Sequence, residues 1–170
     1  MNLSSLSRWT IVLLLYALFP INAQVLGDLK IAVIRVSFPL LDYPGISGNG
    51  DFLYAAKPIE CGDYTIDPPP HDRHYFQSHL IAVDSYYRSV SYGRFGIDLQ
   101  NSTVFPSGNE SSYLINTSMN YYNEISQDDT HEKRITELLR DAVTQAYEAD
   151  NIDFSQFDLI TVIHPGVGQD

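Results

Sequence analysis

The stretch "LKIAVIRVSFPL", residues Leu29–Leu40, decides the fold class. It is almost continuously apolar and rich in β-branched residues, a pattern typical of a strand buried on both faces in the middle of a sheet. Pro39 is expected to end this strand, because proline cannot donate to the strand ladder. The chain is therefore predicted to be built around one central strand near its N-terminal end.

Two long helices and two further strands are predicted after residue 73. The first helix is predicted to end at Gly93, and "RFGIDLQNSTVF" (94–105) follows as a half-exposed strand with alternating apolar residues. The second helix begins with a capping box formed by Asp129 and Glu132, and "FDLITVIH" (157–164) follows as another buried strand. The apolar positions that define the helices are Phe76, Leu80, Val83, Tyr87 and Val90 in the first, and Ile135, Leu138, Leu139, Ala142, Val143, Ala146 and Tyr147 in the second.

This order of elements predicts an α/β fold, with α+β as the alternative class. We expect a mixed sheet with helices packed on it, connected by two long crossovers. Residues 41–73 are rich in Gly, Pro and Asp and are predicted to form a long irregular loop, of the kind that often carries function. Residues 106–130 are predicted to form a second, polar connection.

Composition limits the classes of function that the chain can have. With 170 residues and 44% hydrophobic residues, the chain is long and apolar enough for a single packed domain. Its formal net charge of −11 argues against nucleic acid as a partner, because phosphate backbones would be repelled. Cys61 is the only cysteine, so no disulfide can form within the chain.

The first 23 residues have the features of a secretory signal peptide. Arg8 supplies the positive charge, "WTIVLLLYALF" (9–19) is the apolar region, and cleavage is expected after Ala23. The apolar run is about half the roughly 20 residues that a membrane-spanning helix needs, although an uncleaved N-terminal anchor is the alternative. We therefore expect an exported protein with no stable membrane span after cleavage, and a domain that covers residues 24–170.

Several side chains that could bind metal have simpler structural interpretations. His71 and His74, three residues apart in "HDRH", could bind metal, but an exposed pair at a helix entry is favoured because no further ligand completes the set. Calcium is considered for the acidic stretch 150–158, which lacks the spacing and the glycine of an EF-hand loop. The residues of that stretch that could bind calcium are Asp150, Asn151, Asp153 and Asp158.

Other candidates also have two interpretations. Tyr86, Tyr87 and Tyr92 could line a substrate groove, but core packing is favoured. His79 and His131 lie near predicted helix N-termini and are expected to have no catalytic role. No G-x-S-x-G, G-x-G-x-x-G or H-E-x-x-H motif is present, so no catalytic, cofactor-binding or metal-binding residue is assigned. The glycosylation sequons are at Asn101, Asn109 and Asn116.

Three phrases give the chain a family resemblance. "IAVIRVSFP", then "SVSYGRFGIDL" after "DSYYR", then "IDFSQFDLITVIHPGVGQD" resemble the front half of the immune-inhibitor-A-type (M6-like) secreted metallopeptidases, in the same order and over most of residues 29–170. The residues that match the family phrases are Ser37, Phe38 and Pro39, then Tyr86, Tyr87, Ser91, Tyr92 and Gly93, and finally Asp153, Phe154, Ser155, Phe157, Asp158, His164, Gly166 and Gly168.

The resemblance implies a zinc-dependent endopeptidase that acts on proteins or peptides. In that family zinc is held by an H-E-x-x-H helix that follows the strand matched here by residues 157–164, so residues 24–170 are expected to be the N-terminal scaffold of such an enzyme, resembling the N-terminal subdomain of a zincin and truncated before the zinc-binding helix. Zinc is expected in the intact protein, but none of its ligands is expected among these residues, and the chain alone is expected to be inactive. The alternative is a complete, non-catalytic secreted binding domain or a degenerate peptidase remnant.

Overall fold

The computed structural model describes residues 27–39, 50–55, 67–122 and 130–166. The expected signal peptide, most of the 41–73 loop, Cys61, Asp129 and Gly168 lie outside these ranges. Within them, the predicted strands and two long helices occur in the predicted order, with further short elements between them.

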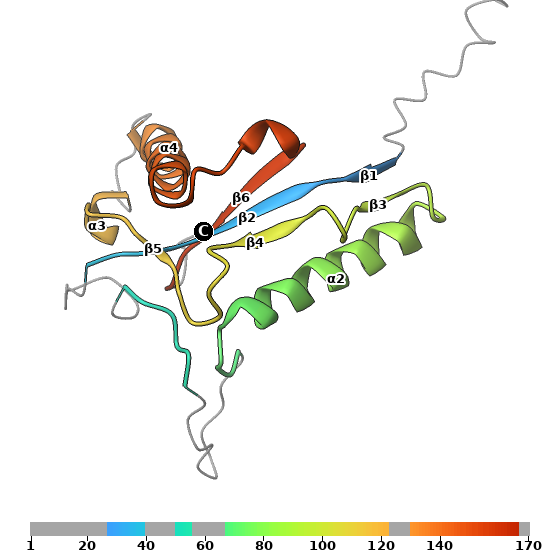
Figure 1. Cartoon of the computed structure of the whole chain (residues 1–170), viewed down its shortest axis with the longest axis horizontal. Helices are drawn as coiled ribbons and strands as arrows, with labels where there is room; N and C mark the ends of the chain where they lie inside the picture. The colour runs from blue at the N-terminus through green and yellow to red at the C-terminus, as the bar shows by residue number, and fades with distance from the viewer. Residues whose placement is uncertain (1–26, 40–49, 56–66, 123–129, 167–170) are drawn as a thin grey trace, which may run out of the picture.

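A parallel sheet forms the centre of the molecule (Figure 1). Strand β2 (Ile31–Ser37) is buried along its whole length, as its apolar sequence predicts. Strands β4 (Thr103–Phe105) and β6 (Leu159–Ile163) pair in parallel with the same part of β2, so they flank it on opposite sides. The remaining parallel pairings are β5 (Tyr113–Leu114) with the end of β2, and β1 (Gly27–Leu29) with β3 (Phe95–Ile97).

Two long helices cover opposite faces of this sheet. On one face, helix α2 (Arg73–Val90) places Phe76 against Ile31 and Val33. On the other face, helix α4 (Thr130–Asp150) places Ala142 and Ala146 against Ile34, Val36 and Phe38. Successive side chains of a strand point to opposite faces, so the alternation along β2 accounts for both layers. The short helix α3 (Met119–Tyr122) and the 3-10 turn η1 (Phe154–Gln156) lie on either side of α4 in the sequence.

The α/β class is confirmed, and so is the central strand. All four pairings between described strands are parallel, so the sheet as described contains no antiparallel strand. None of the described helices is long and apolar enough to cross a bilayer.

Three local predictions differ from the structure. The strand predicted at 94–105 is divided into β3 and β4, because residues 98–102 form a turn in which the Ser102 N–H donates to the Asp98 carbonyl at 2.8 Å. The connection predicted at 106–130 contains β5 and α3. At the end of α2 the expected Gly93 is left-handed, with φ of 75°, but the left-handed stretch begins one residue earlier, at Tyr92 with φ of 55°. The Gly93 N–H closes the helix on the Arg88 carbonyl at 2.7 Å.

Candidate functional site

The carboxyl ends of β2 and β6 meet at the point where the topology of the sheet reverses. From β2 the chain crosses through α2 to β4 on one side, and it later crosses through α4, on the opposite face, to β6 on the other side. In open α/β sheets, the crevice outside the strand ends at such a switch point is the usual place for a ligand. Phe38, just after β2, and His164, just after β6, are the side chains placed there.

His164 has an aromatic environment at this position. Its ring packs edge-on against the Phe38 ring, with centroids 6.0 Å apart, and its Nδ1 lies 3.0 Å from the Pro165 carbonyl oxygen. Phe38 in turn contacts Tyr122, whose hydroxyl donates to Asp141 at 2.7 Å. Burial, together with this bond to a carboxylate, raises the pKa of Tyr122 to about 12. These contacts fix the position of the His164 ring. None of the neighbours named here is a nucleophile or an acid that bonds to His164.

The histidines of "HDRH" belong to the N-terminal cap of α2. The Asp72 carboxylate accepts from the Tyr75 N–H at 2.9 Å, and the side-chain amide of Asn109 donates to the same carboxylate at 2.8 Å. These hydrogen bonds hold the pKa of Asp72 below its usual value. His74 Nδ1 lies 2.8 Å from the Asn109 amide oxygen, and its side chain is 78% exposed. His71 differs from the expected exposed pair, because only 16% of its side chain is exposed.

Zinc does not fit the described residues. Among them, no group of three His, Cys, Asp or Glu side chains could hold a metal ion. The two histidines of "HDRH" interact with separate partners. His71 Nε2 lies 3.4 Å from Asp67, whereas His74 contacts Asn109. The exposed helix-entry interpretation therefore agrees with the structure for His74, whereas His71 lies at the helix entry but is largely buried.

The acidic residues considered for calcium serve separate local structures. Asp150 accepts a hydrogen bond from the Tyr113 hydroxyl. Asp153 caps η1 by accepting from the Ser155 N–H at 3.1 Å, and Asp158 accepts from the Lys30 N–H at 2.8 Å. These side chains face different partners and do not converge on one point.

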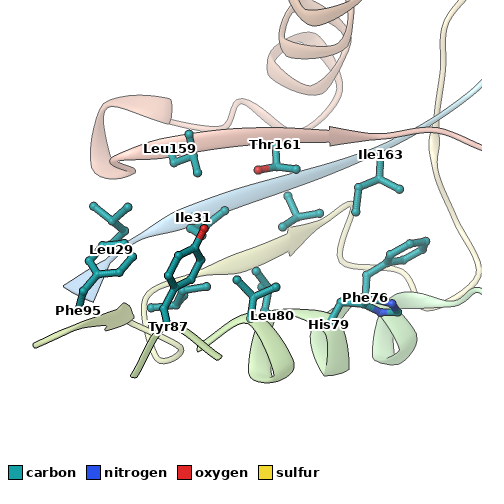
Figure 2. Close-up of a pocket in the computed structure, with 13 residues that line it drawn as sticks. Leu29, Ile31, Phe76, His79, Leu80, Tyr87, Phe95, Leu159, Thr161 and Ile163 are labelled. Atoms are coloured by element: carbon teal, nitrogen blue, oxygen red, sulfur yellow. The ribbon is translucent and has the colours of Figure 1, made fainter. Parts of the chain in front are cut away.

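An apolar groove lies between α2 and the sheet, on the face opposite α4 (Figure 2). Its volume is about 300 Å³, at the lower end of the range for small-molecule sites. The figure shows α2 side chains on one side of the groove and those of β6 on the other. The side chains that line it are Leu29, Ile31, Val33, Phe76, His79, Leu80, Val83, Tyr87, Phe95, Ile97, Leu159, Thr161 and Ile163.

The groove changes the interpretation of the tyrosine cluster. Tyr87 lines the groove and is 40% exposed, as the substrate-groove alternative would place it. Core packing was the favoured interpretation, and it is wrong for Tyr86 and Tyr92, which are 62% and 87% exposed. The apolar stripe of α2 is partly solvent-facing, because α2 covers only part of this face of the sheet and leaves β6 beside it uncovered.

A buried arginine is the feature that sequence reasoning missed. Arg35, in the middle of β2, is fully buried and donates to the carbonyl oxygens of four residues after β4 begins, Phe105, Pro106, Gly108 and Asn109. Its Nη1 donates to Asn109 at 2.8 Å, and its Nη2 donates to Pro106 at 2.7 Å and to Gly108 at 2.6 Å. Burial lowers the pKa of the guanidinium from its usual value. The one signal was a lone charged residue in an otherwise apolar strand, which requires buried partners.

Comparison with known proteins does not assign a family. No protein-family model, curated protein or solved structure matches the chain.

Proposed function

We propose that this chain is the scaffold portion of a secreted zinc-dependent metalloendopeptidase. The observation that carries the proposal is the resemblance of three separate phrases, in the right order, to the front half of the immune-inhibitor-A-type enzymes. Two of these phrases contain Phe38 and His164, whose rings are neighbours just after the carboxyl ends of β2 and β6. The position supports the proposal, since this edge is where α/β sheets assemble their sites.

In this proposal the described residues position the site and do not carry out the reaction. The packing of the His164 ring on Phe38 and the hydrogen bonds from buried Arg35 to the carbonyls after β4 would hold the strand ends in place. Zinc, when bound by the family's H-E-x-x-H helix, would polarise the scissile carbonyl and activate a water molecule. Export through the N-terminal segment remains part of the same proposal.

The proposal is tested by reading the transcript beyond codon 170 and by mass mapping of the secreted protein. We expect an in-frame continuation that contains H-E-x-x-H, together with peptides from that continuation in the secreted protein. A stop directly after codon 170, with a secreted protein that ends at Asp170, would overturn it.

A non-catalytic binding domain is the second candidate, and the apolar groove is the observation that favours it. An apolar fluorescent probe titrated into the full chain should then bind with one-to-one stoichiometry. Val83→Lys, inside the groove, should weaken binding about tenfold, because the lysine must leave the groove or bring its charge into it. Ser89→Lys, at an exposed position of the same helix outside the groove lining, is the matched control and should leave binding unchanged.

A further inference from the structure

The glycosylation sequons differ in how the folded chain uses their asparagine side chains. They begin at Asn101, Asn109 and Asn116, and each of these asparagines is exposed. N-glycosylation joins a bulky sugar to the side-chain amide nitrogen, so the folded chain must leave that nitrogen open to solvent. The hydrogen bonds of the amides therefore distinguish a sequon that can carry a glycan from one that the fold already uses.

The side chain of Asn109 belongs to the N-terminal cap of α2. Its amide nitrogen donates to the Asp72 carboxylate at 2.8 Å, and its amide oxygen lies 2.8 Å from His74 Nδ1. Its main-chain carbonyl accepts from the Arg73 N–H at 2.9 Å and from Arg35 Nη1 at 2.8 Å. A sugar on the Asn109 nitrogen would crowd the carboxylate that caps the helix.

Asn101 has a comparable role in the turn between β3 and β4. Its amide nitrogen donates to Asp98 Oδ2 at 2.7 Å, and its main-chain N–H donates to Asp98 Oδ1 at 3.2 Å. The adjacent Ser102 hydroxyl accepts from the Ile31 N–H at 2.9 Å, which ties this turn to β2. A sugar on the Asn101 nitrogen would replace one of its two hydrogens and crowd Asp98 within the turn.

The side chain of Asn116 has no such role. It lies in a bend between β5 and α3 and forms no hydrogen bond with any other part of the described chain (Figure 1). The backbone is held on both sides of this bend. Before it, the Ile115 N–H donates to the Ser37 carbonyl at 2.8 Å, and after it, the Tyr121 N–H donates to the Ser118 carbonyl at 3.0 Å. The fold thus presents this one amide on a fixed backbone without using it.

We propose that Asn116 carries an N-linked glycan and that Asn101 and Asn109 do not. In the transfer, Nδ2 of Asn116 forms a bond to the anomeric carbon of an oligosaccharide that is attached to a lipid pyrophosphate. The bond from that carbon to the pyrophosphate oxygen breaks, the lipid pyrophosphate leaves, and one amide proton passes to a base of the transferring enzyme. The proposal rests on the proposed export of the chain and is independent of any peptidase role.

The test is mass mapping of the natural exported protein. Enzymatic removal of N-glycans in water enriched in heavy oxygen converts a glycosylated asparagine to a labelled aspartate. We expect the label at Asn116, with Asn101 and Asn109 unmodified. An unlabelled Asn116 in exported protein would overturn the proposal while leaving export intact, and so would equal labelling at Asn109. Protein that stays inside the cell would contradict export itself, and the glycan with it.

Matched variants separate the glycan from the fold. Asn116→Gln should abolish the shift in gel mobility on glycan removal, with little change in the thermal midpoint, because the side chain is exposed and unbonded. Ser118→Thr keeps the sequon and should keep the shift. Asn109→Gln should also keep the shift but lower the thermal midpoint, because the longer side chain moves its amide away from Asp72 and His74. A shift that is lost in Asn109→Gln and kept in Asn116→Gln would contradict the assignment.

Discussion

The two sides of the sheet, β3–β4 and β6, are held in different ways. On the β4 side, polar side chains bond to the backbone across the strands: Ser102 accepts from the Ile31 N–H at 2.9 Å, and Arg35 binds the carbonyls after β4. On the β6 side, the strand pairs with β2 but its outer edge has no described partner. The β4 side is therefore held by side-chain hydrogen bonds to the backbone as well as by strand pairing, whereas among the described residues β6 is paired with β2 alone.

The same contrast separates the two faces. The face under α4 has a core in which Ala142 and Ala146 are fully buried. The face under α2 contains the apolar groove, in which Val83 and Tyr87 are each 40% exposed. Substitutions in the core under α4 should therefore lower the free energy of unfolding strongly, and substitutions in the groove under α2 should lower it weakly.

The largest effect is expected for Arg35→Met. The change removes the donor of several part-buried carbonyls and should lower the free energy of unfolding by about 3 kcal/mol, measured by urea denaturation. Arg140→Met on α4 is the matched control, because Arg140 is 65% exposed and bonds only at the surface; it should change stability by less than about 0.5 kcal/mol. Equal effects of the two changes would contradict the description of the β4 side as closed.

Asp84→Asn should have the next largest effect. The Asp84 carboxylate accepts from the Ile97 N–H at 2.7 Å and pairs with Arg88 at 2.9 Å, which fastens α2 to β3. Loss of the charge should cost about 1–3 kcal/mol at pH 7, measured by urea denaturation.

The pH dependence of this loss has a defined sign. The bond to the Ile97 N–H and the pairing with Arg88 hold the pKa of Asp84 below its usual value of 3.8. The stabilisation is therefore present above about pH 4 and is lost as the pH falls through the lower pKa of the folded state. The difference between Asp84→Asn and the unmodified chain should shrink from pH 5 to pH 2; a constant difference over that range would be inconsistent with this role of the charge.

A smaller effect, of opposite sign, is expected at Tyr92. Its left-handed backbone, with φ of 55°, costs a non-glycine residue about 1 kcal/mol, and its side chain is 87% exposed. Tyr92→Gly should therefore raise the thermal midpoint, measured by calorimetry. Gly93→Ala should lower it by a similar amount, since Gly93 has φ of 75° and a Cβ there would meet no neighbour. The backbone explanation fails if both changes shift the midpoint in the same direction.

The smallest effect is expected for Val83→Ser in the groove. Val83 is already 40% exposed, so the free energy of unfolding should change by less than about 0.5 kcal/mol. Val143→Ser on α4 is the matched change, and it should cost about 1–3 kcal/mol because Val143 packs against the core on that face. Similar costs in urea denaturation would mean that the two faces do not differ.

The elements that could be predicted from the sequence are those with local signals. The unbroken apolar run of β2 and the periodic apolar residues of α2 and α4 indicated the central strand and both helices. The division of the strand at 94–105 was not predicted, because Asp98 and Ser102 form their turn within an alternating pattern that is also compatible with one strand.

The apolar groove and the carbonyl partners of Arg35 could not be predicted, because both depend on how distant parts of the chain pack together. The apolar stripe of α2 has the periodicity of a buried helix, and only the position of α2 relative to β6 leaves Val83 and Tyr87 partly exposed. The carbonyl groups that bind Arg35 lie 70 to 74 residues away in the sequence. Both features depend on which elements lie side by side in the fold.

The central claim, that this chain is the scaffold of a zinc peptidase, is tested most directly by the activity of the natural secreted protein. The protein would be captured with an antibody against the described domain and incubated with an unfolded protein substrate. We predict peptide-bond cleavage that is lost on treatment with a zinc chelator and restored by added zinc. Captured, folded protein that shows no zinc-dependent cleavage of any protein substrate would contradict the claim.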